Sequence, residues 1–536
     1  MGGAEPQARR REGHARPVNL ARAARLLERL ADAGVGELCL CPGGRNSPIV
    51  LAAQCARGLV CYSFFEERSA AFFAVGRARA TGAPVAVVTT SGTAAAELLP
   101  AAVEAYYSGV PLVLVTADRP AAYRHTGAPQ TIEQVGLFGD YAPTVLDGER
   151  PDAELDLAAW DAGRPVHVNI RFDEPLVDGP IPETSVTVRP RAAAARAADA
   201  GPLAAFFARV QRPLVLVGPL AAADREPVRD FLARYAAPVY AEPASGLREE
   251  PALADLLLTS GEGALTRADV DGVLRLGGVP TVRLWRDLEA RLARLPVCSV
   301  ARTPFPGLTR STLVWGPVGA ILQSVAAPPV NRAPTRALIA RDRARAERLA
   351  LLWERYPRAE PALLRAVSGL VPASALVYLG NSLPIREWDL AAERRPRGWT
   401  VGANRGANGI DGQLSTFFGM CGPDRENWAV VGDLTALYDL SAPWILPQLD
   451  AGPIRIVVVN NGGGQIFARL SPHAGLRNEH RHELSGWAAL WEMTYHRWEV
   501  VPGAAPAGAH AVIELLPERE QTARFWRAYD ALDERS

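Results

Sequence analysis

Two short apolar runs near the C-terminus, residues 429–431 and Ile454–Val459, constrain the fold of this chain more than any other feature. Each run is rich in β-branched residues and stops at a small or polar residue, a pattern typical of buried parallel strands. Residues 435–449, between the runs, are long enough for the crossover helix that parallel strands require. The stretch therefore predicts two neighbouring parallel strands with a helix between them.

Polar residues follow both predicted strands at their carboxyl ends. Gly432 and Asp433 follow the first run, and Asn460 and Asn461 follow the second. Ligands bind at this edge of open α/β sheets. Asp433 and Asn461 offer hard oxygen ligands of the kind that Mg²⁺ prefers, and the glycines at 462–464 let a main-chain carbonyl come close. Taken one at a time, each dipeptide is more typical of an ordinary turn after a strand.

The spacing between the two polar turns favours a metal site. Asp433 and Asn461 lie 28 residues apart, which resembles the thiamine-diphosphate motif of G-D-x, a spacer and then N-N. In that family the Asp, the second Asn and the carbonyl two residues beyond it hold Mg²⁺, which in turn holds the diphosphate. The resemblance therefore implies Asp433, Asn461 and the carbonyl of Gly463 as metal ligands. Leu434 stands where many relatives have Gly, a difference that affects no side-chain ligand.

Length and composition set broad limits on the protein. At about 150–200 residues per domain, 536 residues, of which 48% are hydrophobic, predict three domains that each bury a core. The formal net charge is zero, and the sequence has neither a basic stripe nor an acidic tail, so we expect neither a nucleic-acid partner nor a basic partner. No apolar run is long enough to span a membrane.

The N-terminus and the cysteines indicate a cytoplasmic protein. Residues 1–17 are Arg-rich and polar, with no apolar segment behind them, which predicts a loose arm and not a secretory signal. The six cysteines are scattered and form no C-x-x-C motif. A reduced, cytoplasmic protein is the simplest interpretation.

The chain contains no lysine. The absence excludes a lysine Schiff base and a Walker-A lysine. Recognition of phosphate and carboxylate groups must then depend on Arg, on helix N-termini or on a metal.

Alternating strand and helix patterns predict an α/β fold with parallel sheets. We expect an N-terminal pyrimidine-binding-type domain at 1–185, a central Rossmann-like structural domain at 200–328, and a C-terminal diphosphate- and metal-binding domain at 336–536. The central domain has Pro213–Val217 as its first strand but lacks G-x-G-x-x-G, so no dinucleotide site is predicted there. The first and last domains share a plan of parallel strands that end in polar turns, as two halves facing each other across a cofactor would.

Polar strings also follow the predicted strands of the first domain. P-G-G-R-N-S-P follows the strand at 37–41, and Asn46 and Ser47 are suited to cap the next helix, so the string forms either an anion cradle or a tight turn. Glu66 and Glu67 begin an Ala-rich helix, where carboxylates usually complement the helix dipole.

Nine strings at predicted strand ends together resemble one family of thiamine-diphosphate enzymes, the 2-succinyl-5-enolpyruvyl-6-hydroxy-3-cyclohexene-1-carboxylate synthases of the menaquinone pathway. They run in unchanged order from Pro42 to Phe467 and cover both outer domains, whereas the middle domain matches only in kind. The strings are P-G-G-R-N-S-P, F-E-E-R, T-S-G-T, T-A-D-R-P, G-A-P-Q-T-I-E-Q, G-N-S-L-P-I-R, N-R-G-A-N-G-I-D-G, G-D-L-T-A-L-Y-D-L and N-N-G-G-G-Q-I-F.

The resemblance implies a transferase with a three-domain thiamine-diphosphate enzyme fold. The implied reaction is decarboxylation of 2-oxoglutarate and addition of the succinic-semialdehyde carbanion to isochorismate. The implied cofactors are thiamine diphosphate and Mg²⁺ or Mn²⁺, and the implied assembly is a homodimer or homotetramer. The catalytic Glu of the family falls on Glu67, which hydrogen-bonds the aminopyrimidine ring, and Ile410 bends the cofactor.

The resemblance also assigns the remaining site residues. Arg45, Arg119 and Gln130 fall on the isochorismate side, Arg405 on the 2-oxoglutarate carboxylate, and Arg283 on the substrate lysine of the family. The implied cofactor-binding set is Glu67, Ile410, Asp433, Leu434, Thr435, Asn461, Gly463, Gln465 and Ile466. Phe467 and Leu470, with Ile466, match the apolar lining of the substrate pocket. Arg425 is a displaced candidate for an arginine that relatives carry before the metal motif.

Two alternatives remain at this point. Another thiamine-diphosphate-dependent 2-oxoacid decarboxylase or carboligase would release a free aldehyde or an acetohydroxyacid. A non-catalytic scaffold with the same fold would lose Glu67 or the metal ligands, and this sequence has all of them.

Overall fold

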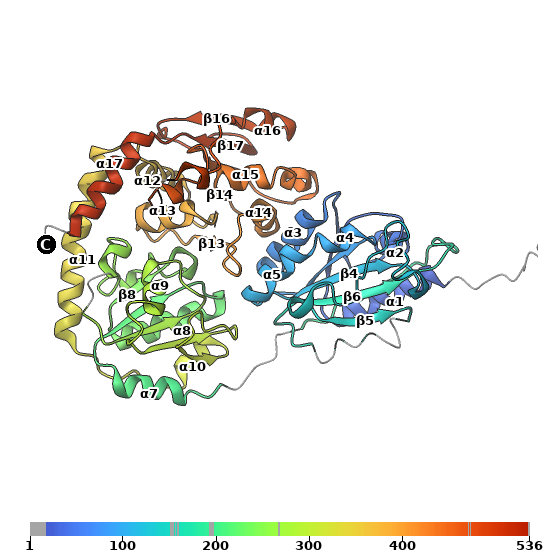
Figure 1. The fold of residues 1–536 in the computed structure, drawn as a ribbon, viewed down its shortest axis with the longest axis horizontal. Helices are drawn as coiled ribbons and strands as arrows, with labels where there is room; N and C mark the ends of the chain where they lie inside the picture. The colour runs from blue at the N-terminus through green and yellow to red at the C-terminus, as the bar shows by residue number, and fades with distance from the viewer. Residues whose placement is uncertain are drawn as a thin grey trace, which may run out of the picture.

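The computed structural model describes residues 18–150, 155, 157, 160–191, 198–265, 269–469, 471 and 473–533. Its strands form three separate sheets in which every pairing of neighbouring strands is parallel. Figure 1 shows the third domain above the second and the first domain to their right, with helices packed around the strands of each domain. The α/β, three-domain architecture predicted from the alternating pattern is confirmed.

The first domain has a six-stranded sheet in the order β2-β1-β3-β4-β6-β5. Its central strands, β3 and β4, consist almost wholly of buried apolar residues, so they are covered on both faces. The strands are β1 (Glu37–Leu40), β2 (Val60–Ser63), β3 (Val85–Thr89), β4 (Leu112–Asp118), β5 (Thr144–Gly148) and β6 (Val166–Arg171). The helices are α1 (Asn19–Asp32), α2 (Ser47–Cys55), α3 (Glu67–Thr81), α4 (Thr93–Ala96) and α5 (Leu99–Ser108), with 3₁₀ turns at Ala121–Tyr123 and Gly139–Tyr141.

The second domain has a five-stranded sheet in the order β11-β10-β9-β7-β8. Its strands are β7 (Pro213–Val217), β8 (Val239–Ala241), β9 (Gly272–Leu276), β10 (Val297–Ala301) and β11 (Thr312–Trp315). Its helices are α7 (Gly201–Arg209), α8 (Ala222–Tyr235), α9 (Arg283–Glu289) and α10 (Val318–Gln323), with 3₁₀ turns at Pro243–Ser245, Pro251–Leu253 and Glu262–Leu265.

The third domain has a six-stranded sheet in the order β13-β12-β14-β15-β17-β16. The strands are β12 (Leu376–Leu379), β13 (Thr400–Gly402), β14 (Asn427–Gly432), β15 (Ile454–Val459), β16 (Thr494–Trp498) and β17 (His510–Leu515). The helices are α11 (Arg332–Arg355), α12 (Glu360–Leu370), α13 (Leu383–Ala391), α14 (Gln413–Met420), α15 (Asp433–Tyr438), α16 (Ser485–Leu490) and α17 (Arg519–Asp530). Shorter 3₁₀ turns lie at Ala442–Gln448, Gln465–Arg469, Ala474–Leu476 and Ala531–Asp533.

The two outer domains have the same strand order. Counted from the first strand of each domain, both sheets read 2-1-3-4-6-5. In each sheet the first strand lies between the second and the third, so the chain reverses its direction of travel across the sheet there. Ligands bind at such a switch point, outside the carboxyl ends of the strands. The shared plan expected for the outer domains is therefore present, and it places one such edge in each of them.

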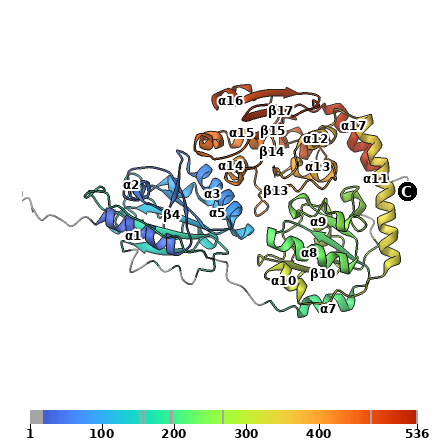
Figure 2. The ribbon, with the colours of Figure 1, turned by 180° about the vertical axis from the view of Figure 1, so that it is seen from behind.

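The first and third domains pack through α3 and α14. The helices cross at Gly76 and Gly419, where a Cβ on Gly76 would meet the carbonyl oxygen of Thr416 at 2.1 Å. Ser69 and Ser415 share a hydrogen bond of 2.7 Å between their hydroxyl groups across the same contact. Glycine is required here because the backbones touch. Figure 2, the view from behind, shows the same neighbourhood of α3 and α14.

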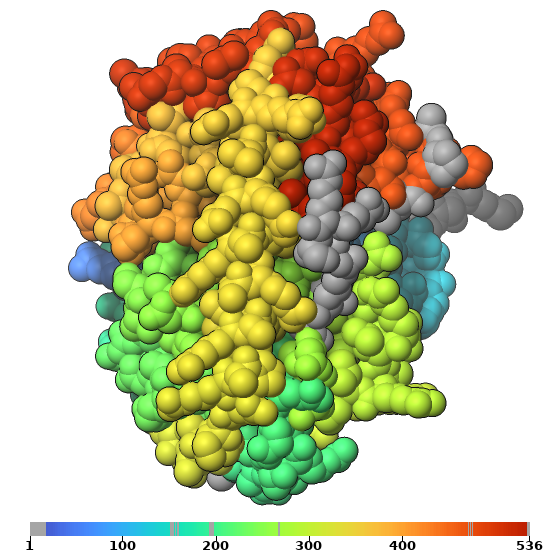
Figure 3. Space-filling view, turned by 90° about the vertical axis from the view of Figure 1, so that its left-hand side faces the viewer, coloured from blue at the N-terminus to red at the C-terminus, as the bar shows by residue number. Residues whose placement is uncertain are grey.

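Helix α11 joins the second and third domains. In Figure 3 it forms a long ridge that runs from the second domain up to the third. Asp342, which is buried, anchors the helix by accepting hydrogen bonds from the backbone and side chains of Thr259 and Ser260 at 2.6–3.1 Å. Among the described residues, no helix is long and apolar enough to cross a bilayer.

Two local expectations were wrong. Residues 435–449 do not form one crossover helix: α15 ends at Tyr438, and a 3₁₀ turn covers Ala442–Gln448. Asp439 points back to α14, where it accepts from the backbone N–H of Ser415 at 2.8 Å, and Pro443 and Pro447 follow. Asn46 does not cap α2 with its side chain, which instead accepts from the N–H of Gly43 at 2.8 Å.

Candidate active site

Asp433 lies at the carboxyl end of β14, as the first residue of α15, and is buried. Its Oδ2 accepts from the backbone N–H groups of Gly462 and Gly463, both at 2.9 Å, and lies 3.2 Å from Nε2 of His480. Its Oδ1 accepts from the N–H of Leu434 at 2.6 Å. Burial raises the pKa of Asp433, while the backbone donors and His480 oppose the rise. The carboxylate thus draws the two polar turns together.

Asn461 follows β15 and is oriented by a glutamate that the sequence analysis did not single out. Its Nδ2 donates to both carboxylate oxygens of Glu360, at 3.2 and 3.0 Å. Glu360 begins α12 and is buried, and burial raises its pKa to about 7. Because the amide nitrogen is committed to Glu360, Oδ1 of Asn461 faces the other way. This oxygen is buried and has no hydrogen-bond partner among the described residues.

The turn after β15 needs its glycines. Gly462 and Gly463 take φ values of +79° and +125°, and a Cβ on Gly463 would meet the carbonyl oxygen of Arg477 at 2.6 Å. The carbonyl of Gly463 accepts from the N–H of Gln465 at 2.8 Å and keeps a second lone pair.

These donors fit a metal-bound diphosphate. A buried amide oxygen without a hydrogen-bond partner is costly unless a ligand binds it. Asn461 lies in the same turn as Gly462 and Gly463, whose N–H groups donate to the Asp433 carboxylate. Carboxylate, amide and carbonyl oxygens together are a hard donor set suited to Mg²⁺ or Mn²⁺.

The other residues predicted to bind the cofactor surround this cradle. Leu434 is half-buried and Thr435 is buried in the first turn of α15, while Gln465 and Ile466 are half-buried in the following 3₁₀ turn. Nε2 of Gln465 is buried without a hydrogen-bond partner among the described residues. Phe467 is 40% exposed. Leu470 lies outside the described residues.

Glu67 is the first residue of α3, and its neighbour Glu66 caps that helix. The carboxylate of Glu66 accepts from the N–H groups of Arg68 and Ser69, each at 3.1 Å, and from the hydroxyl of Ser441. No side chain among the described residues hydrogen-bonds the carboxylate of Glu67 in this way. Burial raises the pKa of Glu67, and the negative charge of Glu66 adds to the rise. Glu66 therefore has the structural role and Glu67 is free for another.

Glu67 lines a cavity of about 680 Å³. The strand ends and turns of the first domain make its wall: Glu66, Glu67, Thr90, Ser91, Gly92, Thr93, Ala94, Glu97, Gln130, Thr131 and Ile132. Gln130 sits in this wall with a φ of +55°. None of the described residues that line this cavity belongs to the third domain, so Glu67 and Asp433 of one chain do not line it together.

The two arginines assigned to isochorismate follow strands of the first sheet. Arg45, after β1, is buried, and its Nη1 donates to the carbonyl of Phe172 at 3.1 Å. Arg119, after β4, stacks over the ring of Tyr123 at 5.3 Å, and its Nε is buried without a hydrogen-bond partner among the described residues. Both therefore lie at the carboxyl edge of the first sheet.

Arg405 and Ile410 lie on the loop between β13 and α14. Nη1 of Arg405 donates to Oδ1 of Asn381 at 2.7 Å, and its Nε is buried without a hydrogen-bond partner among the described residues. Burial lowers the pKa of Arg405. Burial also raises the pKa of Glu242, in the second domain, to about 7, and the positive charge of Arg405 opposes that rise. Ile410 is half-buried.

Arg283 is exposed and lines a second cavity, of about 390 Å³, between the second and third domains. Arg386 lines the same cavity. Arg386 belongs to the string G-N-S-L-P-I-R, and no role was predicted for it from the sequence. Ser382 in that string takes a φ of +72°, a strained conformation common at functional sites.

Arg425 does not face the candidate site. It precedes β14, and its Nη1 donates to the hydroxyl of Thr400, the first residue of β13. Both residues lie at the amino ends of their strands, and the cradle lies at the carboxyl ends. Arg425 therefore lies at the edge of the sheet opposite to the cradle.

Three features together define a class of protein. The two outer domains have parallel sheets with the same strand order, the third domain has a cradle of carboxylate, amide and carbonyl oxygens, and the first domain has a glutamate that lines a cavity. A family model described as the thiamine pyrophosphate enzyme, N-terminal TPP binding domain, matches residues 21–137. The chain is a thiamine-diphosphate enzyme.

Three relatives, each named 2-succinyl-5-enolpyruvyl-6-hydroxy-3-cyclohexene-1-carboxylate synthase, are similar over most of the chain. The protein from Bdellovibrio bacteriovorus is 45% identical over 96% of this chain and 99% of its own. Those from Akkermansia muciniphila (41% identical, 93% of this chain and 96% of its own) and Chloroflexus aurantiacus (33% identical, 93% of each chain) follow. The chain belongs to the 2-succinyl-5-enolpyruvyl-6-hydroxy-3-cyclohexene-1-carboxylate synthase family. This membership confirms the predicted family and enzyme class, and it favours neither of the two alternatives.

Proposed function

We propose that this enzyme is a transferase of menaquinone biosynthesis that decarboxylates 2-oxoglutarate and joins the remaining four-carbon unit to isochorismate. The product is 2-succinyl-5-enolpyruvyl-6-hydroxy-3-cyclohexene-1-carboxylate. The observation that carries the proposal is the buried Oδ1 of Asn461, which has no hydrogen-bond partner among the described residues, in a chain of this family. Three domains with bounds at 1–185, 200–328 and 336–536 contribute to the site.

Asp433, Asn461 and the carbonyl of Gly463 hold Mg²⁺ or Mn²⁺, and the metal holds the diphosphate. Leu434, Thr435, Gln465 and Ile466 would line the same cradle, and Ile410 would hold the cofactor in its bound conformation. Thiamine diphosphate, when bound, supplies the nucleophilic carbon that the side chains of the protein cannot offer.

Glu67 moves the proton. With thiamine diphosphate bound, the carboxyl group of Glu67 would hydrogen-bond a ring nitrogen of the aminopyrimidine and would supply the proton at that nitrogen. The raised pKa of Glu67 suits this task, because a carboxyl group transfers protons best when its pKa approaches the operating pH.

The arginines divide the two acids between them. Arg405 pairs with the distal carboxylate of 2-oxoglutarate, and Arg45, Arg119 and Gln130 bind isochorismate. A guanidinium meets a carboxylate with two parallel hydrogen bonds, which suits dicarboxylate substrates in a chain without lysine. Arg283 takes part from the second domain, and Ile466, Phe467 and Leu470 exclude water from the reacting carbon.

The active enzyme is a homodimer or a homotetramer. None of the described residues that line the cavity at Glu67 belongs to the third domain of the same chain, which supports a cradle supplied by a second chain. Mixing inactive Glu67→Ala and Asp433→Ala chains should restore activity, because some mixed dimers contain one intact site. Activity that stays at zero in exchanged mixtures would contradict a shared site.

The enzyme acts in the cytoplasm. All six cysteines are free, which supports a reducing compartment.

The cradle is tested by cofactor-dependent stabilisation. A ligand at 100 times its dissociation constant stabilises a protein by about 2.7 kcal/mol. Thiamine diphosphate and Mg²⁺ should therefore raise the melting temperature of the wild type and leave that of Asp433→Ala unchanged. A rise that survives Asp433→Ala would overturn the metal assignment.

In parallel, CO₂ release from 2-oxoglutarate should exceed that from pyruvate, and the reverse preference would indicate a different decarboxylase.

A further inference from the structure

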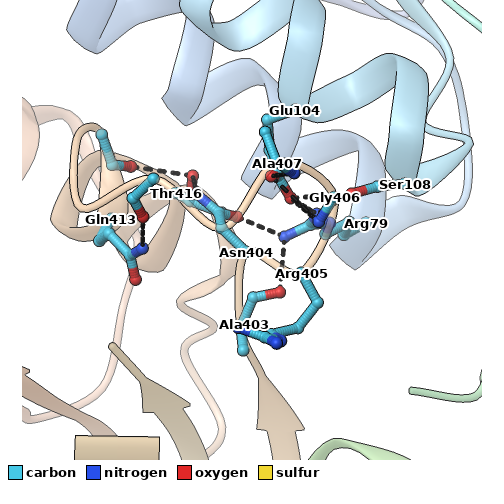
Figure 4. A network of polar contacts seen from close by, with 12 residues as sticks. Arg79, Glu104, Ser108, Ala403, Asn404, Arg405, Gly406, Ala407, Gln413 and Thr416 are labelled. Carbon is cyan, nitrogen blue, oxygen red and sulfur yellow. Dashed lines mark hydrogen bonds and ion pairs between the residues drawn. The ribbon is translucent and has the colours of Figure 1, made fainter. Parts of the chain in front are cut away.

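The loop that carries Arg405 and Ile410 belongs to the third domain, yet residues of the first domain hold it. This loop, residues 403–412, runs from β13 to α14. Figure 4 shows two side chains reaching it from the helices of the first domain, Glu104 of α5 and Arg79 of α3. Neither residue was assigned to the site by the sequence analysis.

Glu104 accepts hydrogen bonds from two successive amides of the loop. The N–H of Gly406 lies 3.0 and 3.1 Å from its two oxygens, and the N–H of Ala407 lies 2.8 Å from Oε2. Glu104 is buried, at 3% exposure. The approach is close, since a Cβ on Gly406 would meet the backbone carbonyl oxygen of Glu104 at 2.5 Å. A carboxylate that accepts several N–H groups at once fixes their direction.

Arg79 completes the contact. Its Nη2 donates to Oε1 of Glu104 at 2.9 Å, and its Nη1 donates to the carbonyl of Ala403 at 3.1 Å and to Oδ1 of Asn404 at 2.6 Å. The ion pair is therefore hydrogen-bonded on both sides, as a buried pair must be. Together the two residues hold the loop at positions 403, 404, 406 and 407, on both sides of Arg405.

The opposite side of the loop is held by Asn381, at the end of β12. Its Nδ2 donates to the carbonyls of Asn404 and Gly409 at 2.8 and 2.7 Å, and its Oδ1 accepts from Arg405. The guanidinium of Arg405 thus rests against its own domain, while the backbone on either side of it rests against the first domain.

We propose that Glu104, supported by Arg79, is a positioning residue: it fixes the 403–412 loop and thereby sets where Arg405 meets the substrate carboxylate. The inference rests on the proposed role of Arg405. The first domain then contributes to the site in two ways. It provides the cavity of Glu67, and it holds the backbone of the third-domain loop that carries Arg405. Glu104 does not touch substrate, so its effect appears in substrate affinity more than in turnover.

The test substitutes Glu104 by Gln. An amide has one acceptor oxygen and brings two N–H donors, so it cannot serve both loop amides and Arg79. Amide hydrogen exchange of Gly406 and Ala407 should become at least about tenfold faster. The KM for 2-oxoglutarate should rise about tenfold with kcat within about twofold, because a small displacement of a binding group weakens binding strongly. A purely structural defect would instead lower the amount of active enzyme and leave KM unchanged.

A matched control is Glu37→Gln. Glu37 accepts from Nε and Nη2 of Arg77, also on α3, at 2.7 Å each, and does not contact the loop. This variant should leave both the KM and the exchange of residues 406 and 407 unchanged. If Glu104→Gln does not fold, Glu104→Asp carries the same test, because it keeps the charge beside Arg79 but draws the oxygens back from the loop.

Two outcomes overturn the proposal, and one separates it from the proposed function. Unchanged exchange at Gly406 and Ala407 in Glu104→Gln would refute the contact. A raised KM that is equally large in the Arg405→Ala background would show that Glu104 does not act through Arg405. If Arg405→Ala itself leaves the KM unchanged, the substrate role of Arg405 is wrong, and the exchange result still decides whether Glu104 holds the loop.

Discussion

Nδ2 of Asn461 donates to both carboxylate oxygens of Glu360, at 3.2 and 3.0 Å. The orientation of Asn461 is thus set before any metal binds, and its oxygen is directed into the cradle. Groups behind a metal ligand typically change metal affinity 10- to 100-fold when they are altered.

Glu360→Gln should therefore weaken Mg²⁺ binding by about 10- to 100-fold, because a Gln side chain presents an N–H group to the Asn461 amide and favours its rotation. The measurement is a Mg²⁺ titration at saturating thiamine diphosphate, followed by melting temperature. Glu354→Gln, on the exposed face of α11, is the control and should bind Mg²⁺ as the wild type does. Equal affinity in Glu360→Gln and the control would contradict the orienting role.

Substitutions of Glu66 and Glu67 should have different effects, on the stability of the protein and on the catalysed proton exchange respectively. Glu66→Ala removes the helix cap and should destabilise the protein by about 1 kcal/mol with thiazolium proton exchange unaffected. Glu67→Gln should keep the fold and the cofactor but exchange that proton much more slowly, because the amide cannot supply a carboxylate. Exchange is followed by NMR in D₂O. If instead Glu66→Ala slows exchange and Glu67→Gln does not, the catalytic assignment belongs to Glu66.

The three substrate arginines should fail in different ways. Arg405→Ala removes a charge-assisted contact of about 1.5–3 kcal/mol, which lowers kcat/KM for 2-oxoglutarate about ten- to hundredfold. Arg45→Ala and Arg119→Ala should leave CO₂ release intact and weaken capture of isochorismate, so more succinic semialdehyde appears per CO₂. CO₂, semialdehyde and adduct are measured in parallel. Equal loss of CO₂ release in all three variants would refute the division.

His167 should make the protein less stable in mild acid. It is fully buried in β6 between the hydroxyls of Thr116 and Thr144, and burial lowers its pKa to about 4. The unfolded chain binds the proton near pH 6.5, so stability that is complete above that pH is lost as the pH falls toward 4. At pH 5 the loss is about 2 kcal/mol. Urea unfolding of His167→Gln should lack this part of the pH dependence, and an equal slope in both proteins would contradict it.

The strands were predictable because burial on both faces leaves an uninterrupted apolar run. Ile454–Val459 and Pro213–Val217 have in the structure the bounds that the sequence indicated. The polar strand ends were equally visible, because Asp433 and Asn461 each lie two residues after such a run. The form of the crossover between β14 and β15 was not predictable from the sequence. Its helix ends where Asp439 accepts from the N–H of Ser415, which lies 24 residues earlier.

The residues that orient the site could not be predicted either, because their partners are also distant in the sequence. Glu360 meets Asn461 across 101 positions of sequence, and Glu104 meets Gly406 across 302. A glutamate in an Ala-rich helix resembles a solvated surface residue until tertiary packing buries it. Local pattern identifies the groups that follow strands, whereas the partners that hold them depend on which helices the fold brings together.

The function is tested most directly by the products of the complete reaction. The enzyme is incubated with thiamine diphosphate, Mg²⁺ and 2-oxoglutarate, with and without isochorismate, and the products are identified by mass spectrometry. We predict 2-succinyl-5-enolpyruvyl-6-hydroxy-3-cyclohexene-1-carboxylate only when both substrates and the cofactor are present, and succinic semialdehyde with CO₂ when isochorismate is left out. CO₂ release that yields free aldehyde alone in the presence of isochorismate, or no cofactor-dependent product at all, would contradict the proposed function.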